Sequence, residues 1–215
     1  MPLLNITEIF HSVQGETTFV GLPTTFIRLS ACNLRCTWCD TTYSFSKGNP
    51  MELSEIIEAV ETNGSRHVCV TGGEPLLQKE VFPLMETLSA KGYIVSLETG
   101  GSLSIEKVPD AVHTILDIKC PGSGMEEKNY WPNIGLLKPI DEVKFVVLDR
   151  TDYEYACNIM KKYRLDSKVN ALLLSPVHGV LDPQVLVDWI LADKLTVRLN
   201  LQIHKTIWTP QTRGV

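Results

Sequence analysis

Three of the chain's six cysteines lie close together in the stretch "ACNLRCTWCDTTY", residues 31–43. Cys32, Cys36 and Cys39 have the spacing Cys-x3-Cys-x2-Cys and follow directly after an apolar run that predicts a strand. Three thiolates on one short loop can ligate three irons of a cubane cluster and leave the fourth iron open to chelate a small molecule. A structural zinc ion would need a fourth ligand from the remaining cysteines or the five histidines, all distant in sequence. The spacing therefore favours an iron–sulfur site, with structural zinc as the alternative.

The bulk composition is that of an ordinary soluble globular protein. The 215 residues are 44% hydrophobic and 21% charged, and the net charge of −5 argues against nucleic acid as the main partner. No secretory signal begins the chain, and no uncharged apolar segment reaches the roughly 18 residues of a membrane span. We therefore expect no membrane association and a cytoplasmic location, where thiols stay reduced and a cysteine cluster is a metal or redox site.

Apolar, β-branched runs alternate with helical patterns along the chain. Predicted strands cover 24–29, 67–71, 93–97, 112–118, 141–147, 170–175 and 195–201, and predicted helices cover 53–64, 79–92, 151–165 and 182–193. This alternation is typical of a mainly parallel α/β sheet. About seven strands with fewer helices predict a single domain over residues 1–215, folded as an incomplete or irregular parallel (β/α) barrel. The irregular segment 120–138 is predicted to be a functional or mobile loop.

Helix boundaries have local signals. Gly64 and Gly92 are predicted to stop two helices, and Asp182 followed by Pro183 is a cap with a residue that the first turn tolerates well. Thr151 and Glu154 have the spacing of a capping box.

Polar and glycine residues follow several predicted strands, in "VTGGEP" (70–75), "LETGG" (97–101), "LDIKCP" (116–121) and "LLLSPVHG" (172–179). The carboxyl ends of parallel strands are where such folds bind ligands. Gly72 and Gly73 let the backbone approach a ligand closely, and Glu74 offers a carboxylate to an ammonium group. Glu98 is a further candidate at the next strand. Taken alone, these segments are also compatible with ordinary strand-end turns, and Lys119 with a solvated lysine.

The cysteine spacing, with Trp38 before the third cysteine and "VTGGEP" after the next helix, resembles the signature of the radical S-adenosylmethionine (SAM) superfamily. The resemblance implies a [4Fe–4S] cluster whose open iron holds the amino and carboxylate groups of SAM. It implies SAM contacts at the strand ends, which we assign to Gly72, Gly73, Glu74, Gly101, Asp117, Ile118, Lys119, Ser175 and His178.

Four further segments narrow the resemblance. "SVQGE" (12–16), "GLPTTFIRL" (21–29), "WCDTTY" (38–43) and "LQIHK" (201–205) occur in the order seen in 7-carboxy-7-deazaguanine synthases. That family converts 6-carboxy-5,6,7,8-tetrahydropterin to 7-carboxy-7-deazaguanine, with hydrogen abstraction from the pterin, ring contraction and loss of ammonia, in the biosynthesis of queuosine-type deazapurines. The expected activity is therefore that of a radical SAM lyase.

The residue types suit a pterin substrate. Glu16 can accept from its amidine-like face and Arg28 can bind its carboxylate, although a surface acid and a simple ion pair are the alternatives. The substrate contacts that we assign are Val13, Gln14, Gly15, Glu16, Arg28, Thr99 and His204. The resemblance implies Mg²⁺ at Thr41, and Asp40 is a second oxygen ligand, although both residue types also cap turns.

Two alternatives remain open from the sequence. An activase that forms a glycyl radical on a partner protein has the same cysteine spacing, and a non-catalytic iron–sulfur or zinc-binding module would bind no SAM. The expected partners are a small pterin and an electron donor such as flavodoxin or ferredoxin, and relatives lead us to expect a homodimer. For the tail 206–215, contact of Arg213 or the Val215 carboxylate with substrate and a frayed end are both open.

Overall fold

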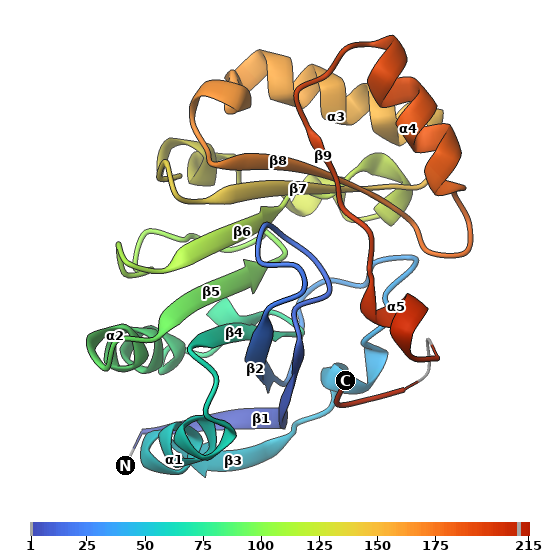
Figure 1. Cartoon of the computed structure of the whole chain (residues 1–215). Coiled ribbons are helices and arrows are strands. Elements are labelled where there is room, and N and C mark those ends of the chain that lie inside the picture. The colour runs from blue at the N-terminus through green and yellow to red at the C-terminus, as the bar shows by residue number, and fades with distance from the viewer. Residues whose placement is uncertain (1, 210–211) are drawn as a thin grey trace.

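The computed structural model describes residues 2–209 and 212–215, within which nine strands form one sheet (Figure 1). The spatial order is β3-β1-β2-β4-β5-β6-β7-β8-β9. The strands are β1 (Leu3–Val13), β2 (Pro23–Leu29), β3 (Asn49–Glu52), β4 (His67–Gly72), β5 (Ile94–Thr99), β6 (His113–Asp117), β7 (Glu142–Val147), β8 (Ala171–Pro176) and β9 (Arg198–Leu199). From β2 onward, each neighbouring pair in this order is parallel. The open, mostly parallel sheet confirms the expected incomplete barrel.

Helices cover one face of this curved sheet and leave the other to the site. They are α1 (Leu53–Asn63), α2 (Val81–Ala90), α3 (Arg150–Tyr163), α4 (Pro183–Ala192) and the short α5 (His204–Ile207). Helices α1 to α4 lie outside the sheet, and the core lies between these two layers. The β1–β2 loop, α5 and the C-terminus lie on the opposite, concave side (Figure 1). No helix among the described residues has the length and apolar character needed to cross a bilayer.

The predicted strands are confirmed, and two more extend the sheet. Strands β1 and β3 pair antiparallel beside β2, so the chain adds a three-stranded antiparallel edge to the parallel part. The run 195–201 contributes only the two residues of β9.

Most of the predicted helix caps are also confirmed. Helix α1 stops at Gly64, whose φ of 71° is left-handed, and Asp182 caps α4 by accepting from the Gln184 N–H at 2.9 Å. The predicted capping box at Thr151 is wrong. Helix α3 begins one residue earlier, because the Asp149 side chain accepts from the Asp152 N–H at 3.1 Å and occupies the cap position.

The irregular segment 120–138 packs against the sheet instead of extending from it. It contains three short 3₁₀ turns, at Pro121–Ser123, Glu126–Lys128 and Trp131–Gly135. The Asn129 side chain accepts from the Lys119 N–H and donates to the Lys119 carbonyl, both at 2.9 Å. This segment therefore fixes the chain directly after β6.

The cysteine loop approaches the end of β4 so closely that only glycine fits there. A Cβ atom on Gly73 would lie 2.1 Å from the Ala31 carbonyl oxygen and 2.8 Å from Cys32 Cβ. At Gly72, where φ is 150°, a Cβ would lie 2.3 Å from the Leu29 carbonyl oxygen. The Gly73 and Glu74 N–H groups donate to the Leu29 and Ala31 carbonyls. The two glycines are thus required for backbone packing, whatever ligand they also meet.

Gly73→Ala is expected to destabilise the fold, because the new methyl group meets backbone that cannot move aside without displacing the cysteine loop. Overpacking of this kind costs about 1–3 kcal/mol. The matched control is Gly135→Ala, since a Cβ there has no neighbour within 4 Å. Urea unfolding measures both free energies. Equal stability of the two variants would contradict the packing argument.

Candidate active site

Residues from the carboxyl ends of the parallel strands, from the β1–β2 loop and from the C-terminal segment surround a cavity of about 620 Å³. Its lining contains most of the site residues predicted from the sequence, which are Val13, Gln14, Gly15, Glu16, Arg28, Cys32, Cys36, Cys39, Asp40, Thr41, Gly72, Gly73, Thr99, Asp117, Lys119, Ser175, His178 and His204. Glu74, Gly101 and Ile118 are outside this lining. Segments that are far apart in sequence, from the first strand to the C-terminal helix, therefore meet at one site.

The cysteine loop presents its three thiols to this cavity. Each cysteine is partly buried, and burial raises the pKa of Cys32 and Cys36. The Leu34 N–H donates to Cys32 Sγ at 3.4 Å, and the Cys39 N–H donates to the Cys36 carbonyl at 3.2 Å. Three sulfur donors on one loop fit the thiolate ligation of an iron–sulfur cluster. Among the described residues, no group of three His, Cys, Asp or Glu side chains is close enough to hold one metal ion.

Glu74 is fully buried beneath the cavity and holds two strand ends together. Its carboxylate accepts from the Leu76 N–H at 3.1 Å, from the Gly100 N–H at 2.8 Å, and from the Thr99 hydroxyl at 2.9 Å. Burial raises the pKa of this carboxyl, against the effect of these hydrogen bonds. Glu74 thus fixes the turn after β5.

Lys144 lies inside the cavity and forms an ion pair with Glu16. Its Nζ lies 2.6 Å from Glu16 Oε2, and the two side chains are only 14% and 12% exposed. The Gln202 amide donates to Glu16 Oε1 at 2.8 Å. Burial alone would raise the pKa of Glu16, but Lys144 and Gln202 hold the pKa below its ordinary value. Glu16 therefore presents an ionised carboxylate to the cavity.

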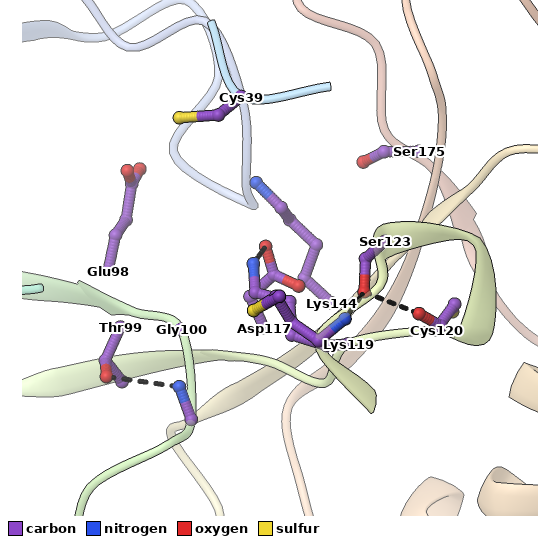
Figure 2. A network of polar contacts seen from close by, with 12 residues as sticks. Cys39, Glu98, Thr99, Gly100, Asp117, Lys119, Cys120, Ser123, Lys144 and Ser175 are labelled. Atoms are coloured by element: carbon purple, nitrogen blue, oxygen red, sulfur yellow. Dashed lines mark hydrogen bonds and ion pairs between the residues drawn. The ribbon is translucent and has the colours of Figure 1, made fainter. Parts of the chain in front are cut away.

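The pKa of Glu98 is shifted in the opposite direction to that of Glu16. Its buried carboxyl accepts from the Thr71 hydroxyl at 3.0 Å and from the Gln14 amide at 3.4 Å. Burial, with Glu16 nearby, raises the pKa of Glu98 although Lys144 opposes this. Figure 2 shows Glu98, Lys144 and the Lys119–Asp117 ion pair, whose atoms lie 3.0 Å apart, around the same space as Cys39.

Arg28 has a partner of its own beside the cavity. Its Nε lies 2.8 Å from Glu8 Oε1, and the Tyr43 hydroxyl donates to the same oxygen at 2.9 Å. The guanidinium also lies over the Phe10 ring, 5.7 Å from its centroid. These contacts orient the largely buried Arg28 side chain. Arg28 lies in the cavity lining and is one of the substrate contacts predicted from the sequence.

The C-terminal segment closes the site from the concave side. Lys205 Nζ lies 2.5 Å from Asp40 Oδ2, and the Ile203 N–H donates to the Gly15 carbonyl at 3.0 Å. A Cβ on Gly15 would lie 2.0 Å from the His204 imidazole Nδ1, so that glycine is required for this contact. In the tail, Arg213 lies 4.1 Å from the centroid of the Tyr43 ring, and Val215 contributes to the lining.

Thr71, Lys144, Gln202 and Lys205 are among the lining residues that sequence reasoning missed. A signal existed for Lys144, because a lysine inside a strand predicted to be covered on both faces needs a buried partner. The motif "LQIHK" contained Gln202 and Lys205, but only His204 was assigned a role. Nothing in "VTGGEP" distinguishes Thr71 from an ordinary strand residue.

Comparisons with known proteins agree with this geometry. The model of the Radical SAM superfamily matches residues 26–119. The chain is 45% identical to the 7-carboxy-7-deazaguanine synthase of Koribacter versatilis, over 99% of this chain and 100% of that protein. It is 43% identical to the one of Chlorobaculum tepidum, over 99% and 97%. The crystal structure of QueE from Escherichia coli has a similar fold, with a TM-score of 0.73 at 23% identity over 93% of this chain and 94% of that chain.

Lys144→Met is expected to remove the charge that keeps Glu16 ionised, so burial then raises the pKa of Glu16 above its ordinary value. In the wild type, Glu16 contributes stability that is present above its unfolded pKa and lost as pH falls through the lower folded pKa. In the variant, the uncompensated carboxylate instead costs stability as pH rises. Breaking such a buried pair costs about 3–5 kcal/mol at neutral pH, and less where Glu16 can protonate.

Urea unfolding at pH 5 and pH 8 measures this difference. The control is Lys128→Met, which removes an exposed lysine from the segment after β6 and should change neither value. A loss of stability for Lys144→Met that is the same at both pH values would be inconsistent with an ionised Glu16.

Proposed function

Because this chain belongs to the family of 7-carboxy-7-deazaguanine synthases, we propose that its cavity holds a carboxylated tetrahydropterin next to SAM and an iron–sulfur cluster. The chain is a radical SAM lyase that forms 7-carboxy-7-deazaguanine in queuosine biosynthesis. One observation carries the assignment of the site. The cysteine motif and the Gln14–Glu16 segment come from different strands and line the same cavity.

Cys32, Cys36 and Cys39 would hold three irons of the [4Fe–4S] cluster. When bound, the cluster and SAM together supply the radical that starts the reaction on the substrate. The proposed SAM contacts come from the strand ends, at Gly72, Gly73, Glu74, Gly101, Asp117, Ile118, Lys119, Ser175 and His178. Of these residues, Glu74, Gly101 and Ile118 are not part of the cavity lining.

The pterin would bind on the side of Gln14 and Glu16. The ionised Glu16 carboxylate accepts from the amidine-like edge of a pterin, and the Gln14 amide and the backbone of Val13 and Gly15 complete that face. Arg28 attracts the substrate carboxylate, and its bond to Glu8 uses Nε, so that the guanidinium is oriented before the substrate arrives. Thr99 and His204 are the remaining proposed contacts, of which Thr99 already donates to Glu74.

Burial raises the pKa of Glu98, whereas Lys144 and Gln202 lower the pKa of Glu16, so the pKa values of these two neighbouring carboxyls are shifted in opposite directions. Pairs of this kind are suited to acid and base roles in one site. We propose that Glu98 is the carboxyl of this pair that takes up a proton more readily, while Glu16 binds the substrate. The alternatives of a glycyl-radical activase and a non-catalytic metal module receive no support from the relatives that match nearly the whole chain.

The proposal also covers the metal ion, the domain organisation and the partners of the enzyme. We propose Mg²⁺ at Thr41, with Asp40 as the second ligand, although Asp40 is already paired with Lys205. We also propose a single domain over residues 1–215, supported by one sheet that extends from Leu3 to Leu199. We further propose that the enzyme is a homodimer, that it is located in the cytoplasm, and that it receives electrons from a flavodoxin or ferredoxin.

Anaerobic reconstitution tests the activity directly. With SAM, 6-carboxytetrahydropterin, Mg²⁺ and dithionite, the protein should form 7-carboxy-7-deazaguanine, detected by its mass. Cys32→Ala should lose the cluster absorbance and the product together, whereas Cys157→Ala, outside the cavity lining, should keep both. Full iron content in Cys32→Ala would exclude Cys32 as a ligand. Cleavage of SAM without a deazaguanine product would exclude the pterin as substrate.

Thr41→Val is expected to raise the Mg²⁺ concentration needed for half-maximal activity, because it replaces an oxygen ligand by a methyl group of the same shape. Changes in and around metal sites commonly weaken affinity about 10–100-fold. Thr42→Val, at the neighbouring exposed threonine, is the control and should leave the Mg²⁺ requirement unchanged. The same Mg²⁺ dependence in both variants would remove Thr41 from the metal site.

A further inference from the structure

The loop between β1 and β2, residues 14–22, brings the proposed pterin-binding side chains into the cavity. It is closed at its base by two backbone hydrogen bonds, from Gln14 N–H to the Leu22 carbonyl and from Gly21 N–H to the Gln14 carbonyl, both 2.8 Å long. Gln14 and Glu16 line the cavity, whereas Thr17 to Phe19 continue away from it toward the amino ends of the parallel strands. The position of the loop therefore determines where Gln14 and Glu16 lie.

Two buried polar side chains from distant elements bind the loop immediately after Glu16. Asn200, which follows β9, accepts from the Thr17 N–H at 2.7 Å. Glu142, the first residue of β7, accepts from the Thr18 N–H at 3.2 Å and also from the Thr18 hydroxyl. Asn200 is 5% exposed and Glu142 is fully buried, so neither can exchange these partners for water without cost.

The backbone at Thr17 needs such support. Its φ of 67° is left-handed, a conformation that is unfavourable by about 1–2 kcal/mol for a residue with a Cβ. Thr17 is 3% exposed, and its hydroxyl accepts from the Phe19 N–H at 3.1 Å. The surrounding hydrogen bonds therefore hold a strained turn in the residue that directly follows Glu16.

Phe19 completes the attachment at the amino ends of the strands. Its ring lies between His67 at the start of β4 and His113 at the start of β6, with centroids 5.5 Å and 5.1 Å away. The loop thus crosses from the cavity to the opposite end of the barrel.

We propose that Glu142 and Asn200 are positioning residues that hold the loop 14–22, and through it Gln14 and Glu16, in the geometry that receives the substrate. This inference rests on the proposed function of Gln14 and Glu16 and extends it to residues that do not line the cavity. Asn200 also donates to the Ser175 hydroxyl at 2.8 Å and to Glu16 Oε2 at 3.3 Å. It therefore connects the pterin side of the site to the strand end that is proposed to meet SAM.

The first experiment measures the loop itself, without substrate. Hydrogen exchange of the peptide that covers residues 14–22 is compared in the wild-type holoenzyme, Glu142→Ala and Asn200→Ala. The control is Ser65→Ala, which removes a buried 2.7 Å hydrogen bond to Thr25 near the same end of the barrel but touches no residue of the loop. Exchange at 14–22 should become faster in the two loop variants only, with β4 and β5 unchanged.

The second experiment measures binding of the substrate in the reconstituted enzyme. Glu142→Ala and Asn200→Ala should raise KM for 6-carboxytetrahydropterin about 10–100-fold, as expected for a misplaced binding group. In Glu142→Ala the change in kcat should be much smaller, and in this variant the cluster content and the cleavage of SAM in the absence of pterin should match the wild type. Glu142→Gln, which keeps the volume and one acceptor oxygen, should recover most of the affinity.

A double-mutant cycle separates positioning from general destabilisation. If Glu142 acts through Glu16, Glu142→Ala should have little further effect on KM in a Glu16→Ala background. An equal effect in both backgrounds, or unchanged exchange of the loop in both variants, would overturn the proposal. Should the wild type cleave SAM but convert no pterin, the substrate assignment fails, and the exchange measurement alone decides whether these residues hold the loop.

Discussion

The ion pair between Glu16 and Lys144 is the interaction on which the charge of the whole cavity depends. Taking two charges out of water costs free energy, and replacing such a pair by apolar residues is often neutral or stabilising. A pair that points into a cavity instead provides a fixed, ionised carboxylate where a ligand binds. Lys144 is part of strand β7, and its side chain reaches into the cavity. Its ion pair with Glu16 therefore holds the β1–β2 loop against this strand. The same lysine lies near Glu98 and Asp117, and thereby limits the repulsion among three carboxyls.

The cysteine loop depends on a different constraint, which is close packing of backbone on backbone. Its position beside β4 requires that Gly72 and Gly73 carry no side chain, and Glu74 then fixes the neighbouring turn through buried hydrogen bonds. The motif "TGGEP" therefore has a structural reason that is independent of any ligand. This packing also serves the proposed cluster, because a loop that packs this tightly presents its thiols in one orientation.

Much of the fold and the site could be predicted from local patterns. The parallel strands follow from nearly continuous apolar runs, and the ligand-binding edge follows from glycine and polar residues at their carboxyl ends. Strand β1 was missed because "LLNITEIFHSV" mixes apolar and polar residues over eleven positions without a clean period of two. The spacing of Thr151 to Glu154 fits a capping box, but the helix is capped two residues earlier, where the Asp149 side chain accepts from the Asp152 N–H. The partners of Lys144, Asn200 and Glu142 in the β1–β2 loop could not be predicted, because they lie 124 to 184 residues away in the sequence.

An open barrel must cover its concave side with something other than another strand, and here the C-terminal segment does so. Its ion pair from Lys205 to Asp40 contributes little, because the Asp40 side chain is 46% exposed and water screens such a pair. The firmer attachment is at Gly15, which bonds to Ile203 and leaves space for the His204 ring. That attachment joins the C-terminal segment to the same loop that Glu142 and Asn200 hold. The two ends of the sequence therefore meet at the substrate side of the site, and the geometry of the β1–β2 loop determines whether the cavity is both correctly charged and covered.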